Sequence, residues 1–224
     1  MYQISNAKIQ MMLDCERCFW MRENRRLRRP KFGSVSVAMT MDKLAKDYMD
    51  KKRGEQSEVV DNLLPHPDQQ KIDLWRNWKA GLVAIDKGIK LSGAIDDILT
   101  NGHEFAPIDF KTVAEEDQAE AGSLGYQLDL YAILLEANGM PTLDHGYLYF
   151  SYPESRVTFA RKIVTWKLEP DRARELVKRA IKIIEGPEPE PGYECDYCLY
   201  GIQSSWAVRD AKQEKEKNNA NTSS

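Results

Sequence analysis

The residues with the clearest chemical potential lie between positions 90 and 112, where acidic and basic side chains alternate with apolar ones. Asn101-Gly102 divides this stretch into two arms, and the dipeptide favours a two-residue type I′ turn because both central positions need positive φ. The sequence therefore predicts an antiparallel hairpin. Side chains alternate along each arm, so Asp96, Asp109 and Lys111 should project from the same face.

The register of this predicted hairpin brings two acidic residues close together. With a two-residue turn, Asp96 lies opposite Pro107. Asp109 then lies opposite Ala94, so the two aspartates are diagonal neighbours with Cβ atoms roughly 7 Å apart. Two carboxylates at that separation can enclose a hard divalent cation such as Mg²⁺ or Mn²⁺. Lys111 would stand beside the ion.

The opposite face of the hairpin is apolar, with Ile95, Ile108 and Phe110 as its members. Gly93 opposite Phe110 would leave room for the aromatic ring. Surface strands often carry aspartate and lysine on a wet face without any function, so an ordinary exposed hairpin is the alternative interpretation. Because the second face is apolar, we favour the interpretation that the three polar groups form a functional site.

Four cysteines form a second set of candidate ligands, arranged as two C-x-x-C pairs. The pairs lie about 180 residues apart, so they can meet only if the fold brings both ends of the chain together. In a reducing compartment this pattern indicates metal ligation more than disulfides. Four sulfur ligands suit zinc or an iron-sulfur cluster, and spacing does not choose between them. Reduced, unligated thiols are the alternative. The four residues are Cys15, Cys18, Cys195 and Cys198.

The most basic segment of the chain follows the first cysteine pair, at residues 22–31. A solvated helical face is one interpretation of such a charge run, and a phosphate-binding stripe is the other. Pro30 and Gly33 should end the helix that carries it. The candidate nucleic-acid-binding residues, set against the single acid Glu23, are Arg22, Arg25, Arg26, Arg28, Arg29 and Lys31.

The composition bounds the class of protein. A chain of 224 residues is long enough for one domain, expected over residues 1–206, and a polar tail at 207–224 is expected to be disordered after a short helix. The net charge of −3 gives no global attraction to nucleic acid, so any such binding must be local. The first residues lack the apolar core of a signal peptide, and no apolar run can span a bilayer. We expect a soluble, cytoplasmic protein without a membrane partner.

Periodicity predicts the remaining elements. Apolar residues at helical spacing indicate helices, and alternating runs bounded by turn residues indicate strands. The expected helices cover residues 5–30, 34–52, 67–84, 123–137 and 170–185, and further strands cover residues 146–152 and 157–166.

Three motifs together carry a resemblance to a known family. They are Gly93-Ala-Ile-Asp96, Asp109-Phe-Lys111 and Gln127-Leu-Asp-Leu-Tyr131, in this order and bracketed by the cysteine pairs. Over residues 5–206 the chain resembles the PD-(D/E)XK nuclease superfamily, in particular its RecB-like branch with the CRISPR-adaptation exonucleases. The resemblance implies an α/β fold of restriction-endonuclease type. Its central mixed sheet would be flanked by helices, and a four-cysteine metal site would join the N- and C-terminal ends.

The same resemblance implies roles for individual residues. Asp96 and Asp109 would bind Mg²⁺ or Mn²⁺, with the carbonyl of Phe110 as a further ligand. Lys111 would position the attacking water or stabilise charge on the phosphoryl oxygens. The family's catalytic set would extend to Gln127 and Tyr131, one helical turn apart beside the cleft. Where the family helix often offers a histidine ligand, this chain has Asp42.

The cysteine motifs depart from the iron-sulfur members of this branch. Those members commonly supply one cysteine from the N-terminal helix and three from the C-terminal segment, whereas this chain has two and two. Cys18 would replace the missing ligand. The resemblance implies a structural [4Fe-4S] cluster, with Zn²⁺ as the alternative.

The leading hypothesis is a metal-dependent DNA nuclease, exonuclease-like on single-stranded or free ends, in recombination, repair or CRISPR adaptation. Its partners would be DNA and other proteins of those pathways. The first alternative is a weak or inactive nuclease fold that binds DNA within a larger complex. A zinc-stapled structural protein without a nucleic-acid role is the second alternative.

Overall fold

The computed structural model describes residues 1–30, 36–119, 124–155 and 158–221. The chain divides into two compact units. The sheet unit comprises Met1–Asn6 and Gly33–Arg179, and the cysteine unit comprises Ala7–Phe32 and Ala180–Ser224. The sequence predicts one domain over residues 1–206. That the two units together form this single domain stays a prediction.

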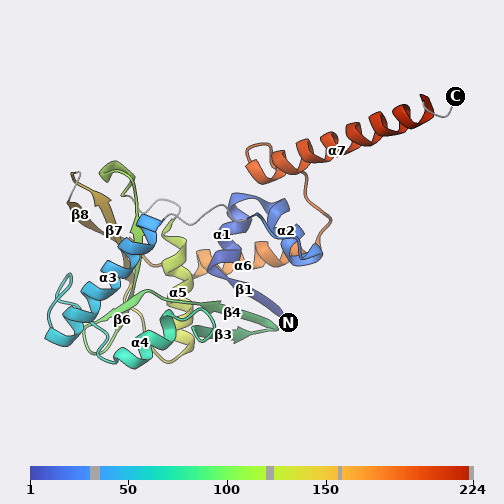
Figure 1. The fold of residues 1–224 in the computed structure, drawn as a ribbon. Helices are drawn as coiled ribbons and strands as arrows, with labels where there is room; N and C mark the ends of the chain where they lie inside the picture. Colours follow the sequence, from blue (N-terminus) through green and yellow to red (C-terminus); the bar gives the residue numbers. More distant parts are fainter. Residues whose placement is uncertain (31–35, 120–123, 156–157, 222–224) are drawn as a thin grey trace. The chain divides into compact units, whose positions relative to one another are not determined.

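The sheet unit is built on a mixed five-stranded sheet with the order β2-β5-β6-β7-β8. Figure 1 labels three of its strands, β6, β7 and β8. β6 and β7 are parallel, and the other neighbours are antiparallel. A parallel pair needs a crossover, which helix α5 supplies between these two strands. The strands are β2 (Leu64–Pro65), β5 (Asp97–Thr100), β6 (Phe105–Thr112), β7 (His145–Pro153) and β8 (Phe159–Lys167).

A second, three-stranded sheet in the same unit has the order β1-β4-β3. β1 is parallel to β4, and β3 is antiparallel to it. Helix α5 packs on this sheet as well as on β6, so one helix bridges both sheets. The strands are β1 (Tyr2–Ser5), β3 (Leu82–Asp86) and β4 (Ile89–Gly93).

Helices α3 and α5 pack on the two faces of β6, whose residues alternate between them. Ile108 and Phe110 join a core with Ala45 and Met49 of α3, while the intervening residue Asp109 faces α5. This alternation separates the apolar core from the polar side chains. The helices are α3 (Ser36–Glu55), α4 (Gln69–Arg76), α5 (Tyr126–Ala137) and α6 (Pro170–Glu185), with a short 3₁₀ turn η1 (Glu116–Gln118).

The cysteine unit consists of α1 (Asn6–Asp14), α2 (Glu16–Arg25), the end of α6 and α7 (Asp196–Asn221). Trp20 anchors α2 to the chain after α6, because its indole N–H donates to the Gly186 carbonyl at 3.0 Å. Helix α7 reaches Asn221, further than the short helix expected from the sequence, and its residues 211–217 are strong helix formers. The order of the tail beyond residue 206 stays a prediction.

The loop of the predicted hairpin holds four residues. Thr100 pairs with Phe105, so residues 101–104 form the loop, and only Gly102 among them has a positive φ, +94°. The Asn101 carboxamide oxygen accepts hydrogen bonds from the backbone N–H groups two and three residues later, at 3.0 and 2.9 Å. This side chain stabilises a wider turn, so the predicted two-residue type I′ turn is wrong. Because the difference is two residues, both arms keep their predicted faces.

The first arm of the hairpin is shorter than predicted. β4 ends at Gly93 and belongs to the three-stranded sheet, while β5 begins at Asp97, so Gly93 does not lie opposite Phe110. Helix α5 covers the glycine instead. A Cβ atom there would lie 2.8 Å from Leu134 Cδ1 and 3.1 Å from Tyr131 Cε1. The chain therefore passes from one sheet to the other through residues 94–96.

Two predicted helices also end earlier than expected. α4 ends at Arg76, and β3 begins at Leu82, inside the helix predicted for residues 67–84. Gly81 lies just before β3 and close to the neighbouring strand, because a Cβ atom there would lie 2.3 Å from the carbonyl oxygen of Gly93. α2 ends at Arg25, and Arg26 takes the left-handed conformation with φ of 57°.

None of the helices in the described ranges has the length and apolar character needed to span a bilayer.

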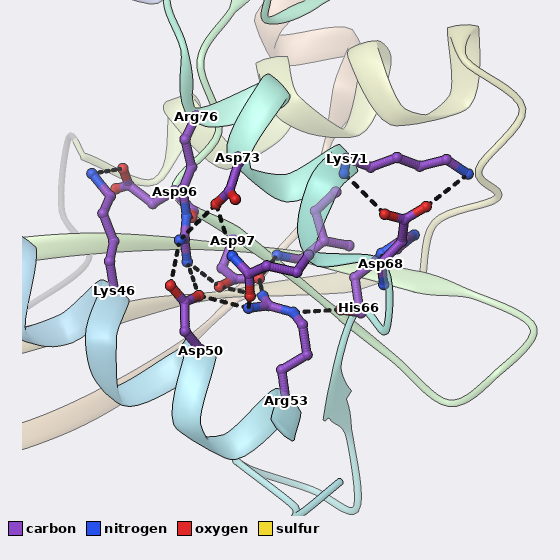
Figure 2. A network of polar contacts seen from close by, with 12 residues as sticks. Lys46, Asp50, Arg53, His66, Asp68, Lys71, Asp73, Arg76, Asp96 and Asp97 are labelled. Atoms are coloured by element: carbon purple, nitrogen blue, oxygen red, sulfur yellow. Dashed lines mark hydrogen bonds and ion pairs between the residues drawn. The ribbon is translucent and has the colours of Figure 1, made fainter. Parts of the chain in front are cut away.

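A buried ionic network joins α3, α4 and β5 (Figure 2). Asp97 is fully buried and accepts from Arg53 at 2.6 and 2.8 Å and from Arg76 at 2.7 Å. Asp50 accepts from the same two guanidinium groups at 2.6 and 3.1 Å. The Arg53 Nε–H also donates to the His66 carbonyl at 2.6 Å. Such a network is stabilising only while every buried charge has partners.

We predict that Asp97→Asn lowers the free energy of unfolding by about 3–5 kcal/mol, because it leaves two buried guanidinium groups undercompensated. Urea unfolding followed by tryptophan fluorescence measures this loss. Glu55→Gln is the control, since it breaks the exposed Lys51–Glu55 pair and should cost less than about 1 kcal/mol. Equal losses in the two variants would contradict a structural role for the network.

Candidate active site and four-cysteine site

Asp96 lies at a bend directly before β5, whose first residue, Asp97, is fixed by the ionic network. The Arg76 Nε–H donates to the Asp96 carbonyl at 2.8 Å and holds the backbone (Figure 2). The Asp96 carboxylate accepts from the Phe110 backbone N–H at 2.9 Å and lies 3.2 Å from Lys46 Nζ.

Asp109, Lys111 and Gln127 form a connected polar cluster. Lys111 Nζ lies 2.6 Å from Asp109 Oδ2, an ion pair without hydrogen-bond geometry, and no hydrogen bond from the described residues reaches that buried oxygen. The Gln127 carboxamide donates to Asp109 Oδ1 at 2.6 Å and accepts from Lys111 Nζ at 2.8 Å. One amide therefore sets the positions of both charged groups.

Tyr131 closes the cluster one helical turn along α5. Its hydroxyl donates to the Ala94 carbonyl at 2.7 Å and accepts from the Gln127 amide at 2.6 Å. Burial and the nearby aspartate charges raise the pKa of Tyr131 well above its ordinary value, so the hydroxyl stays a donor. The structure thus gathers the five residues that the sequence proposes as catalytic: Asp96, Asp109, Lys111, Gln127 and Tyr131.

Burial and the charge of Asp96 raise the pKa of Asp109 to about 7. Only 1% of Asp109 is exposed, so its ionised form loses most of its hydration. Lys111 opposes the shift but does not cancel it. A divalent cation bound by both carboxylates would remove their repulsion and favour the ionised form. The donor set, two adjacent carboxylates with one unbonded oxygen, fits Mg²⁺ or Mn²⁺.

Lys46 is a charged neighbour of the site that the sequence analysis missed. Its Nζ lies 2.7 Å from Asp42 and 3.2 Å from Asp96, so an ammonium group separates these two carboxylates. Burial alone would lower the pKa of Lys46, but the two carboxylates raise it. The four-residue spacing from Asp42 on one helix was the available signal. The roles of Asp42 and of the Phe110 carbonyl as metal ligands stay predictions.

The four cysteines meet within the cysteine unit. Their sulfur atoms all lie within 4.8 Å of one another, and all four residues, each in the described part of the chain, are free thiols. Cys15 lies 3.6 Å from Cys198, and Cys18 lies 3.6 Å from Cys195 and 3.8 Å from Cys198. Cys15 and Cys18 flank the first turn of α2, and the other pair flanks the start of α7. The prediction that both ends contribute to one site is confirmed.

The four sulfurs lie close enough together to be ligands of one metal group. The three sulfur pairs above lie at 3.6–3.8 Å. Four soft donors at this spacing form a metal-binding site.

The basic segment does not form one helical stripe. α2 ends at Arg25, whose guanidinium lies 5.6 Å from the Trp20 ring centre. Arg29 turns inward and pairs with Asp14 at 3.1 Å. The continuous helix predicted up to Pro30 is therefore wrong. Of the other candidate nucleic-acid contacts, Arg22 lies 3.8 Å from Glu23, Arg26 and Arg28 are exposed, and Lys31 lies outside the described residues.

The raised pKa of Asp109 predicts a specific pH dependence of stability. The folded protein holds this proton more tightly than the unfolded chain, whose aspartate titrates near about 3.9, so the free energy of unfolding should fall as pH rises from there to about 7. Asp109→Asn cannot ionise. Between pH 5 and pH 8, without divalent cations, its stability relative to wild type should rise by on the order of 2 kcal/mol. Parallel pH profiles in urea unfolding would contradict the shift.

Comparison with known proteins agrees with this geometry. Several solved structures resemble this chain, and for the two described here, at these identities, the likeness concerns the fold alone. The crystal structure of SSO0001 is 14% identical with a TM-score of 0.51, and the match covers 90% of this chain and 85% of that chain. A protein from Eubacterium rectale described as a candidate exonuclease is 15% identical with a TM-score of 0.50, and the match covers 88% and 87%.

Sequence comparison gives a family assignment. No curated protein sequence matches the chain. A family model described as the PD-(D/E)XK nuclease superfamily matches residues 36–202, a range that includes the aspartate pair, Lys111 and the second cysteine pair. Because this match covers well over half of the chain, the chain belongs to the PD-(D/E)XK nuclease superfamily.

Proposed function

We propose that the sheet unit hydrolyses phosphodiester bonds in DNA with Mg²⁺ or Mn²⁺. The observation that carries the proposal is the buried Asp109 carboxylate beside Asp96, with Lys111 Nζ 2.6 Å away. Two like charges in a buried site are unfavourable unless a cation lies between them. Membership of a nuclease superfamily supports phosphodiester chemistry at this position.

The proposed metal site uses Asp96, Asp109 and the Phe110 carbonyl. The chemistry that the bound ion supplies is polarisation of the scissile phosphate and a lower pKa for the attacking water. By resemblance Asp42 would be a further ligand. That role requires Lys46 to release Asp42, because the two side chains form an ion pair at 2.7 Å.

Lys111 would hold the attacking water or stabilise negative charge on the phosphoryl oxygens. Its Nζ is fixed by Asp109 and by the Gln127 carboxamide at 2.8 Å, so little reorganisation is needed when charge develops. Tyr131 would keep Gln127 in place through its hydroxyl. In this proposal Gln127 and Tyr131 act by positioning the two charged groups.

The substrate we favour is DNA with a single-stranded or free end. The fold neighbour described as a candidate exonuclease and the superfamily assignment support a nucleic-acid substrate. Recombination, repair and CRISPR adaptation are the processes that the resemblance to the RecB-like branch implies. Other proteins of those processes would be the partners.

A DNA-binding module without cleavage is the second candidate. Lys46 favours it, because its ammonium group lies 3.2 Å from Asp96 and already neutralises one carboxylate. A chain that keeps this ion pair would have less need for a metal ion. The two candidates differ in whether phosphodiester bonds are cut.

We predict that Asp109→Ala and Lys111→Ala each reduce cleavage at least about a hundredfold, since each removes charge at the reacting centre. Cleavage of end-labelled single-stranded DNA with Mn²⁺ measures the effect. Asp171→Ala and Lys178→Ala are the matched controls, because both side chains are exposed and form ion pairs with neighbours on α6. The controls should cut at the wild-type rate.

A gel-shift experiment beside the cleavage assay separates the candidates. Binding of DNA without cleavage by the wild-type chain would select the binding module. Absence of DNA affinity even at low salt, where phosphate contacts are strongest, would favour a purely structural protein. Unchanged cleavage by either site variant would remove the catalytic assignment.

A further inference from the structure

The distances between the four thiolates distinguish a single zinc ion from a [4Fe-4S] cluster, the two metal groups that four cysteines can hold. In a single-ion site every sulfur binds the same atom, so the distances between sulfurs are the edges of one tetrahedron. In a four-iron cluster each thiolate binds a different iron at the corner of a cube. The sulfurs then stand further apart than in the single-ion site by the spacing between two irons.

The observed distances match the smaller arrangement. Three of the sulfur pairs lie at 3.6, 3.6 and 3.8 Å, and no pair among the four cysteines exceeds 4.8 Å. A zinc-thiolate tetrahedron has edges of about 3.8 Å. A four-iron core would force each of these sulfurs outward from its present position.

The backbone beside the site leaves little space for that movement. Gly192, at the end of the connector that precedes α7, packs against the thiolates. A Cβ atom at this glycine would lie 3.3 Å from Cys15 Sγ and 3.2 Å from Cys195 Cβ. The connector therefore encloses the first and third cysteines at van der Waals distance. Moving these two sulfurs apart would displace it.

Arg29 supplies the charge that a single-ion site of this kind needs. A divalent ion with four thiolates carries a net charge of about −2. The Arg29 guanidinium lies beside Cys18, where its charge favours the thiolate, and it stacks on the Tyr197 ring at 4.7 Å. Asp14 holds it from the other side at 3.1 Å. These contacts fix the cation against the thiolates, as outer partners of metal ligands commonly are fixed.

We propose that the four-cysteine site of this chain binds one zinc ion, with Arg29 as the outer partner of Cys18, and not the [4Fe-4S] cluster that the family resemblance implies. The proposal concerns the cysteine unit. It does not depend on whether the sheet unit cuts DNA.

The test is the metal content of the full chain, purified anaerobically from cells supplied with both iron and zinc. We expect about one zinc per chain, no acid-labile sulfide and no brown colour. About four irons and four sulfides per chain would overturn the proposal. After removal of the native metal, the thiolate-to-cobalt band of a tetrahedral site should saturate at one equivalent of Co²⁺ per chain, and the carboxylates of the sheet unit cannot give this band. The chain has only four cysteines, so that signal can come from no other place. Absence of this spectrum would also overturn the proposal.

The Arg29 contact has its own measurement. Arg29→Gln should weaken the binding of Co²⁺ and Zn²⁺ by about 10–100-fold and shift the thiolate-to-cobalt charge-transfer band, because it removes an outer partner of a ligand. Arg28→Gln is the matched control, since it removes an exposed charge one residue away. Arg29→Lys keeps the charge without the planar donor fork and should recover part of the affinity. Equal affinities for Arg29→Gln and Arg28→Gln would refute the assigned contact.

Discussion

The buried pairing of Asp97 with Arg53 and Arg76 is the interaction on which the candidate active site depends. Asp96 lies at a bend directly before Asp97, so fixing Asp97 also limits where the Asp96 backbone can lie. Arg76 strengthens the coupling, because it binds both Asp97 and the backbone carbonyl of Asp96. The cost of removing these charges from water is offset only by complete pairing, which three separate elements provide.

Helix α5 supplies the other half of the site for a topological reason. The parallel strands β6 and β7 require a crossover, and the helix that makes it lies on the face where Asp109 points. Asp129 anchors this helix. Its carboxylate is fully buried and accepts from the Trp166 indole at 3.1 Å and from Arg172 at 2.7 Å. Contacts with Trp166 of β8 and Arg172 of α6 therefore hold the helix that places Gln127 beside the acidic pair.

The features that could be predicted from the sequence are those that follow from local periodicity. Alternation along the hairpin predicted which face Asp109 would take, and the cysteine spacing predicted a shared site. Features that rest on distant contacts could not be predicted. The loop length depends on the Asn101 side chain, and the position of Lys46 depends on how α3 approaches β5. The basic run predicted a helix past Arg25, but Arg26 adopts a left-handed conformation that no charge pattern reveals.

The effect of an insertion in the loop at residues 101–104 depends on whether the number of added residues is odd or even. Adding two residues leaves the phase of the second arm unchanged, as the difference between the predicted and observed loops illustrates. Adding one would rotate Asp109 into the apolar core and expose Phe110, unless a β-bulge absorbed the extra residue. Relatives of this chain should therefore vary at this loop in steps of two, or carry a bulge in β5 or β6.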